Sequence, residues 1–156
     1  MISVDISGHR FQVHAAAIFV HDGHVLLHKL ENDTFWALPG GRVESGEDAR
    51  TTILREMEEE LNEFIECSRL LYVVENFFTY SNKPNHEVGL YFQAHFHPKS
   101  ALLEKSRSHI GVEADKRREF RWFPKELLPG LELYPSFLRE SLSQPTLIFQ
   151  HVVQRG

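Results

Sequence analysis

Residues 41–63 read GRVESGEDARTTILREMEEELNE, a glycine turn followed by a predicted helix that carries a dense run of glutamates. Five carboxylates fall in the C-terminal half of this helix, where the helix dipole already disfavours negative charge: Glu56, Glu58, Glu59, Glu60 and Glu63. Each pair three or four positions apart costs about 0.2–0.5 kcal/mol without a counter-charge. Because Arg55 can offset only part of this repulsion, the pattern predicts a divalent cation held by carboxylate oxygens.

The apolar residues of the same segment form one stripe on a helical wheel, and this stripe should face the core. Its members are Ala49, Ile53, Leu54, Met57 and Leu61. Glu56 and Glu60 lie at its edge, so we expect the carboxylates to line a rim where the helix meets a sheet. The alternative is a solvated acidic face without a ligand, the commoner arrangement for an arbitrary helix. The preceding glycine turn favours the metal.

These residues resemble the signature of the Nudix hydrolase family: glycine, five residues, glutamate, seven residues, then Arg-Glu-apolar-x-Glu-Glu-x-Gly-apolar. Its first seven specified places are filled in register by Gly41, Glu47, Arg55, Glu56, Met57, Glu59 and Glu60. Two places differ, because Asn62 replaces the glycine and Glu63 the apolar residue. Asparagine also tolerates the left-handed conformation of a helix end, so the turn should survive.

The resemblance implies an α/β protein with the Nudix fold, an α/β/α sandwich around a mixed β-sheet. It also implies Mg²⁺ or Mn²⁺ bound by Glu56, Glu59, Glu60 and the Gly40 carbonyl, with Arg55 orienting Glu56 and Glu47 pairing with Arg55. The family often adds a glutamate from a distant loop, and the candidates are Glu87, Glu113 and Glu119. We favour Glu113, because we expect residues 98–118 to form a long polar loop, where catalytic carboxylates are often placed.

The implied activity is hydrolysis of the pyrophosphate bond in a nucleoside diphosphate linked to another moiety. A nucleoside triphosphate, ADP-ribose, a nucleotide sugar and a dinucleoside polyphosphate all stay open as substrates. Phe35, Tyr80 and Gly41 are the candidate substrate-binding residues, although one tyrosine in an aromatic strand is more often part of a core. Two other interpretations stay open: a nucleotide sensor without catalysis, and an acidic interaction protein without metal.

Composition narrows the class of protein further. With 156 residues and 42% hydrophobic content, the chain should form one domain over residues 1–156. The net charge of -5 argues against nucleic-acid binding through a basic surface. A single cysteine, Cys67, and the lack of a signal peptide or membrane-length apolar run predict a cytoplasmic protein without a membrane partner. A homodimer is left open.

The remaining chain reads mainly as strands. We expect strands at residues 2–7, 10–20 and 25–30, with Asp22-Gly23 as a hairpin turn. Two more strands, at 70–80 and 86–97, should flank a turn at residues 83–85, and a short strand should cover 119–123. A helix is predicted over 134–142, and the end of the chain forms either a terminal strand or a contact arm. Zinc binding by the histidines near residues 14–28 is disfavoured, because a hairpin scatters them over both faces.

Overall fold

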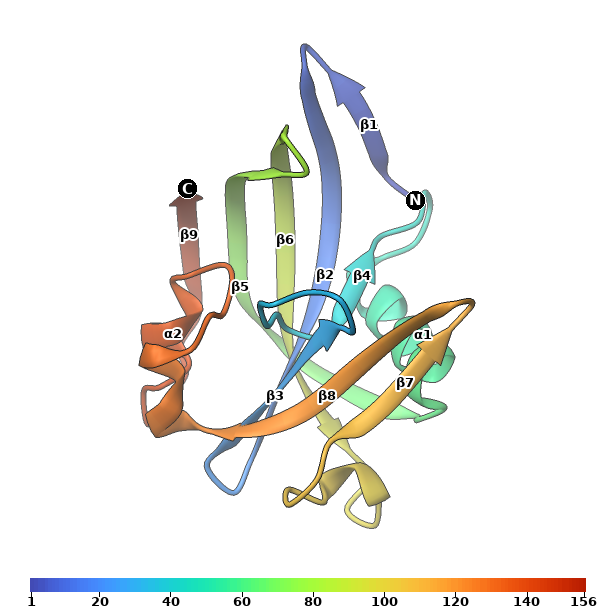
Figure 1. The fold of residues 1–156 in the computed structure, drawn as a ribbon, viewed down its shortest axis with the longest axis vertical. Helices are drawn as coiled ribbons and strands as arrows, with labels where there is room; N and C mark the ends of the chain where they lie inside the picture. Colours follow the sequence, from blue (N-terminus) through green and yellow to red (C-terminus); the bar gives the residue numbers. More distant parts are fainter.

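A mixed sheet of nine strands forms the frame of the protein in the computed structural model, which describes residues 1–156 (Figure 1). The strands are β1 (Ser3–Ile6), β2 (His9–His21), β3 (His24–Leu30), β4 (Gly40–Arg42), β5 (Ile65–Tyr80), β6 (Lys83–Phe96), β7 (His109–Glu113), β8 (Lys116–Pro124) and β9 (Gln150–Arg155). Their order is β7-β8-β3-β2-β6-β5-β9, and β1 and β4 also pair with β2. The β2–β6 and β5–β9 pairs are parallel and the others are antiparallel.

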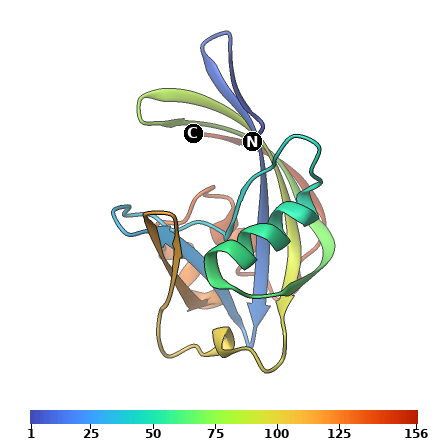
Figure 2. The ribbon, with the colours of Figure 1, turned by 90° about the vertical axis from the view of Figure 1, so that its right-hand side faces the viewer.

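Strand β2 lies at the centre of the sheet and is covered on both faces. Ala15 and Ala17 point to one face, where they pack with Ile53 and Met57 of helix α1 (Ala49–Leu61). The side chain of Ala16 points to the other face, whose core includes residues of the short helix α2 (Leu138–Ser141). Figure 2 shows α1 lying across the sheet beside β2. The predicted α/β architecture with a mixed sheet between helices is therefore confirmed.

Most expected strands are present, but two predictions in this part of the chain need correction. The β5–β6 turn lies at Ser81 and Asn82, both with positive φ, rather than at residues 83–85. Residues 98–118 are not one long loop, because they contain 3₁₀ helix η1 (Ala101–Leu103), strand β7 and the start of β8. Strand β7 was missed because it lies at the sheet edge, where charged and polar residues are tolerated.

The C-terminal part of the chain contains less helix than predicted and ends in a strand. Helix α2 has only four residues within the expected range 134–142, and it follows the 3₁₀ helix η2 (Lys125–Gly130). Strand β9 extends the sheet beside β5, which confirms the terminal strand among the two predicted alternatives. None of the helices combines the length and the apolar character that crossing a membrane requires.

Candidate active site

Both ends of helix α1 are capped by local contacts. Asp48 caps the N-terminus, where its Oδ1 accepts a hydrogen bond of 2.9 Å from the backbone N–H of Thr51. Asn62 ends the helix in the left-handed conformation, with φ 54° and ψ 41°, which confirms that asparagine serves in place of glycine. The prediction that Leu54 belongs to the buried apolar stripe was wrong, because its exposed fraction is 41%. Thr52 is buried instead, and its hydroxyl donates a hydrogen bond to Glu47.

Arg55 connects the acidic residues of this helix. Its Nε and Nη2 lie 2.9 and 3.0 Å from the two carboxylate oxygens of Glu47, a bidentate arrangement that fixes the guanidinium. Its Nη1 lies 3.1 Å from Glu56 Oε1 and 3.3 Å from Glu59 Oε2. Hydrogen bonds from Arg55 lower the pKa of Glu47 to about 2. The predicted contacts of Arg55 with Glu47 and Glu56 are therefore confirmed.

Three carboxylates converge beside Arg55. Glu56, Glu59 and Glu113 each offer an oxygen, and these oxygens lie within 4.8 Å of one another. Glu113 comes from the end of β7, so the hairpin missed in the sequence brings this residue to α1. Burial raises the pKa of Glu56, and the nearby charge of Glu113 raises it further. One guanidinium does not balance three such carboxylates, and this set of oxygen donors fits a hard divalent cation.

Glu60 lies on the same helix but faces the interior. Arg118 Nη1 lies 3.0 Å from its Oε1, yet this contact lacks hydrogen-bond geometry, and both carboxylate oxygens are buried without a hydrogen-bond donor. Burial raises the pKa of Glu60 to about 8 despite the opposing charge of Arg118. A carboxylate in this state gains from a cation, so the unsatisfied oxygens of Glu60 also fit a metal.

The two other candidates for the distant carboxylate lie elsewhere. Glu119 forms an ion pair of 2.9 Å with Arg121 and accepts a hydrogen bond from Ser108. Glu87 accepts a hydrogen bond of 2.6 Å from Gln12 Nε2 on the adjacent strand. Of the three residues, only Glu113 belongs to the carboxylate group on α1.

Gly41 permits the close contact between β4 and the carboxylate group. A Cβ atom at this position would lie 2.5 Å from the Cδ and Oε1 atoms of Glu56, so any larger residue would displace the Glu56 carboxylate from its present position. Gly41 therefore touches the helix, and its contact with substrate stays a prediction. The neighbouring residue Arg42 pairs with His14 of β2, and the His14 side chain lines a cavity on the other face of the strand.

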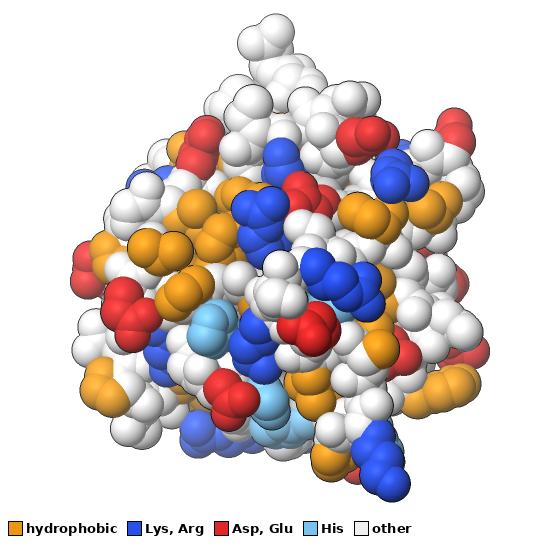
Figure 3. All heavy atoms as spheres, turned by 60° about the horizontal axis from the view of Figure 1, so that its bottom comes forward, with side chains coloured by type: hydrophobic (Ala, Val, Ile, Leu, Met, Phe, Trp, Pro, Cys, Tyr) orange, Lys and Arg blue, Asp and Glu red, His pale blue; other side chains and the backbone are white.

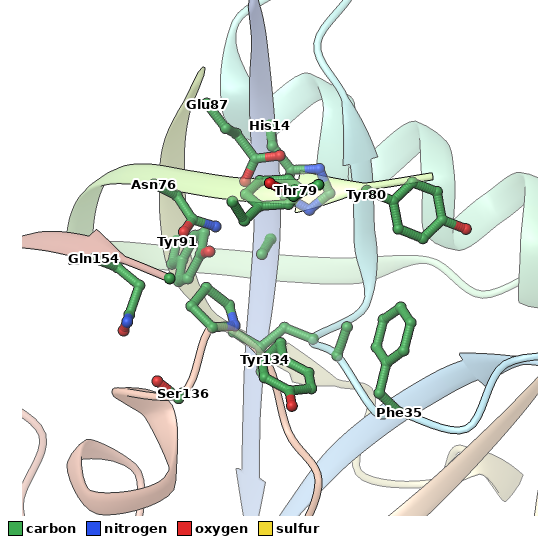
Figure 4. A pocket seen from close by; sticks show the side chains of 16 residues that line it. His14, Phe35, Asn76, Thr79, Tyr80, Glu87, Tyr91, Tyr134, Ser136 and Gln154 are labelled. Carbon is green, nitrogen blue, oxygen red and sulfur yellow. The ribbon is translucent and has the colours of Figure 1, made fainter. Parts of the chain in front are cut away.

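This cavity has a volume of about 470 Å³ and is walled by aromatic and apolar side chains. Phe35 and Tyr80, both predicted to bind substrate, line it together with Tyr134 and Tyr91 (Figure 4). The rings of Phe35 and Tyr134 meet edge to face, with centroids 5.8 Å apart. A cavity of this size and lining is typical of a small-molecule site.

Sequence reasoning missed the polar residues of the cavity, above all Asn76 and Gln154. A signal was available for Asn76, because the residue stands in an apolar and aromatic strand at a position with the same parity as the buried residues Tyr72 and Val74. For Gln154 only the pairing of β9 with β5 reveals the location.

The pKa of Glu60 leads to a test of the site without metal. An acid whose pKa rises on folding, here from 4.5 to about 8, makes the folded state less stable as the pH increases through this interval. Glu60→Gln removes this loss, so we expect the metal-free variant to melt at a higher temperature than wild type at pH 8 and at a similar temperature at pH 5. Glu58→Gln, an exposed neighbour, is the control and should show no such divergence. A difference in melting temperature between wild type and Glu60→Gln that stays the same from pH 5 to pH 8 would contradict the prediction.

Comparison with known proteins adds three observations. The family model of the NUDIX domain matches residues 10–143. The protein YjhB of Bacillus subtilis (strain 168), provisionally assigned as an ADP-ribose pyrophosphatase, is 26% identical over 134 residues, which are 85% of this chain and 57% of YjhB. The chain thus spans little more than half of that relative.

Solved structures show the same architecture. A MutT NUDIX hydrolase from Burkholderia pseudomallei is 30% identical, with a TM-score of 0.63 over 87% of this chain and 98% of the other. The mutator MutT protein from Bacillus halodurans, 20% identical, has a TM-score of 0.66 over 90% of this chain and 86% of the other. Because the identity with the Bacillus halodurans protein is only 20%, that similarity shows the fold alone.

Proposed function

The chain belongs to the NUDIX domain family, and from this premise we propose that it is a metal-dependent hydrolase of pyrophosphate bonds in nucleoside diphosphates linked to another moiety. The observation that carries the proposal is the convergence of Glu56, Glu59 and Glu113 around Arg55. Exposed acidic side chains that bind no cation would only repel one another in this arrangement. Here the group adjoins strand β4, whose partner β2 lines a cavity large enough for a nucleoside.

The same residues suggest how the reaction proceeds. Glu56, Glu59 and Glu113, with Glu60 behind them, would hold Mg²⁺ or Mn²⁺, and the Gly40 carbonyl is the proposed backbone ligand. A bound divalent ion neutralises phosphate charge and lowers the pKa of a bound water. Arg55 holds Glu56 in place through their 3.1 Å contact, and Glu47 holds Arg55 in turn. Glu56 then accepts the proton of the water that attacks phosphorus, while the bond from phosphorus to the bridging oxygen breaks.

A small nucleotide rather than a nucleic acid is the proposed substrate. The face shown in Figure 3 carries basic side chains interspersed with acidic and apolar ones, not gathered into one patch. The net charge of -5 is consistent with this view. ADP-ribose enters as one candidate because of the assignment of YjhB. A cytoplasmic location belongs to the same proposal.

A hydrolysis screen tests this function. The purified protein is incubated with Mg²⁺ or Mn²⁺ and nucleoside triphosphates, ADP-ribose, nucleotide sugars or dinucleoside polyphosphates, and products are identified by mass. We expect cleavage of an anhydride bond in at least one class, with one oxygen atom taken from ¹⁸O-labelled water. Removing the metal with EDTA should abolish turnover, and adding Mg²⁺ back should restore it. Tight binding of nucleotides without any cleavage would instead support the sensor without catalysis.

A further inference from the structure

A row of polar side chains crosses the sheet beneath the cavity. Gln12 of β2 pairs in register with Glu87 of β6, Glu87 with Asn76 of β5, and Asn76 with Gln154 of β9. Residues in register on neighbouring strands point to the same face, and this face holds the cavity. The exposed fractions of Gln12, Glu87 and Asn76 are only 5%, 6% and 7%. Burial of this kind is costly unless the groups find hydrogen-bond partners.

The protein satisfies only part of this row. Gln12 Nε2 donates to Glu87 Oε2, and Gln154 Oε1 accepts a hydrogen bond of 3.0 Å from the backbone N–H of Phe137. Oε2 is the one oxygen of Glu87 that accepts a side-chain hydrogen bond within the chain, and the Asn76 amide makes none. Both residues line the cavity, so a carboxylate oxygen and an amide stand side by side for a ligand.

The rest of the cavity suits a flat ring. Figure 4 shows Glu87, Asn76 and Tyr80 on the strands of the sheet, with the rings of Phe35 and Tyr134 on the opposite side of the cavity. Aromatic walls of this kind stack on any nucleobase and do not discriminate among bases. Discrimination among bases must therefore come from the polar residues Glu87 and Asn76. A ligand that leaves the Glu87 carboxylate without a hydrogen bond is penalised.

We propose that Glu87 and Asn76 make the cavity selective for a guanine-type base, an inference that rests on the proposed nucleotide hydrolysis. A carboxylate only accepts hydrogen bonds, and Glu87 Oε2 keeps a second lone pair besides the one that Gln12 uses, so the group favours a base edge with two adjacent N–H donors. Guanine presents N1–H and the N2 amino group there, and its adjacent O6 is an acceptor that suits a donor such as the Asn76 amide. Adenine presents the acceptor N1 at the same edge, and two acceptors that face each other repel. This preference differs from the adenine nucleotide named for YjhB.

The first test compares substrates that differ only in the base. Values of kcat/KM are measured for GTP, ITP and ATP, and for the matched dinucleoside tetraphosphates of guanosine and adenosine. A good bidentate pair is worth about 1–3 kcal/mol, which corresponds to about fivefold to 150-fold in favour of guanine over adenine. ITP, which lacks the N2 amino group, should fall between the two. Equal values for guanine and adenine substrates would overturn the proposal and leave the hydrolase function intact.

Variants test whether Glu87 causes the preference. Glu87→Gln keeps the shape of the side chain but replaces an acceptor oxygen by a donor, and it should lower kcat/KM for guanine substrates about tenfold to hundredfold while sparing adenine substrates. Glu75→Gln is the matched control, because Glu75 neighbours Asn76 in β5 but contacts His151. An unchanged guanine-to-adenine ratio in Glu87→Gln would overturn the assignment.

A binding measurement separates this inference from the proposed function. Calorimetric titration of wild type with GMP and AMP reports base selection without any bond cleavage. Tighter binding of GMP, lost in Glu87→Gln and kept in Glu75→Gln, supports the inference even if the hydrolysis screen finds no substrate. Equal binding of GMP and AMP, or binding of neither, contradicts it even if the protein hydrolyses other nucleotides.

Discussion

Replacing Glu56 by glutamine is expected to lower kcat/KM on the substrate found in the screen by about 10²- to 10³-fold, the range for losing one preorganised electrostatic contact. The carboxylate of Glu56 lies in the group with Glu59 and Glu113, contacts Arg55 and is the proposed proton acceptor. Glutamine keeps its size but removes the negative charge and the basicity. The measurement is steady-state kinetics at saturating Mg²⁺, with circular dichroism to show that the fold is kept.

Glu58→Gln is the matched control for this experiment. It makes the same chemical change on the same helix, but Glu58 is exposed and lies outside the carboxylate group. We expect the control to retain activity within about twofold, since surface substitutions have small effects. Similar losses in both variants would mean that the net charge of α1 matters rather than the group around Arg55, and the proposed site would then be wrong.

Gly40→Ala is expected to produce the largest loss of stability, about 2–5 kcal/mol. Gly40 has φ 153°, and an added Cβ would lie 2.0 Å from the backbone oxygen of Ala15 and 2.8 Å from Ala16 Cα. Neither backbone atom can move without separating β4 from β2. The cost combines strain of about 1–2 kcal/mol for a backbone conformation unfavourable to L-residues with about 1–3 kcal/mol for overpacking. Urea denaturation monitored by tryptophan fluorescence measures the change in the free energy of unfolding.

Gly46→Ala provides the comparison for Gly40→Ala. Gly46 also has a positive φ, 82°, but no atom lies within 4 Å of an added Cβ. Its replacement should therefore cost only the backbone term, about 1–2 kcal/mol. If both variants lose the same stability, the close approach of β4 to β2 is not what requires glycine at position 40. Activity should fall in Gly40→Ala as well, because a shifted β4 moves Gly41 away from Glu56.

The local features of the site could be predicted from the sequence. Spacing along one helix placed Arg55 beside Glu56 and Glu59, and the left-handed helix end at Asn62 was expected from its residue type. Such contacts depend on a helical repeat of 3.6 residues, which the order of amino acids specifies directly. The strands around Asp22-Gly23 were predicted for the same reason, because a hairpin turn is also local.

Contacts between distant segments were decided only by the tertiary structure. Glu113 was favoured over Glu87 and Glu119 only because a polar loop was expected around it, and the pairing of β7 with β8 was needed to bring it to α1. The row from Gln12 to Gln154 likewise exists only because four strands pair in one register. Pairing of strands far apart in the chain is selected by the packing of the whole core, and no short stretch of sequence contains that information.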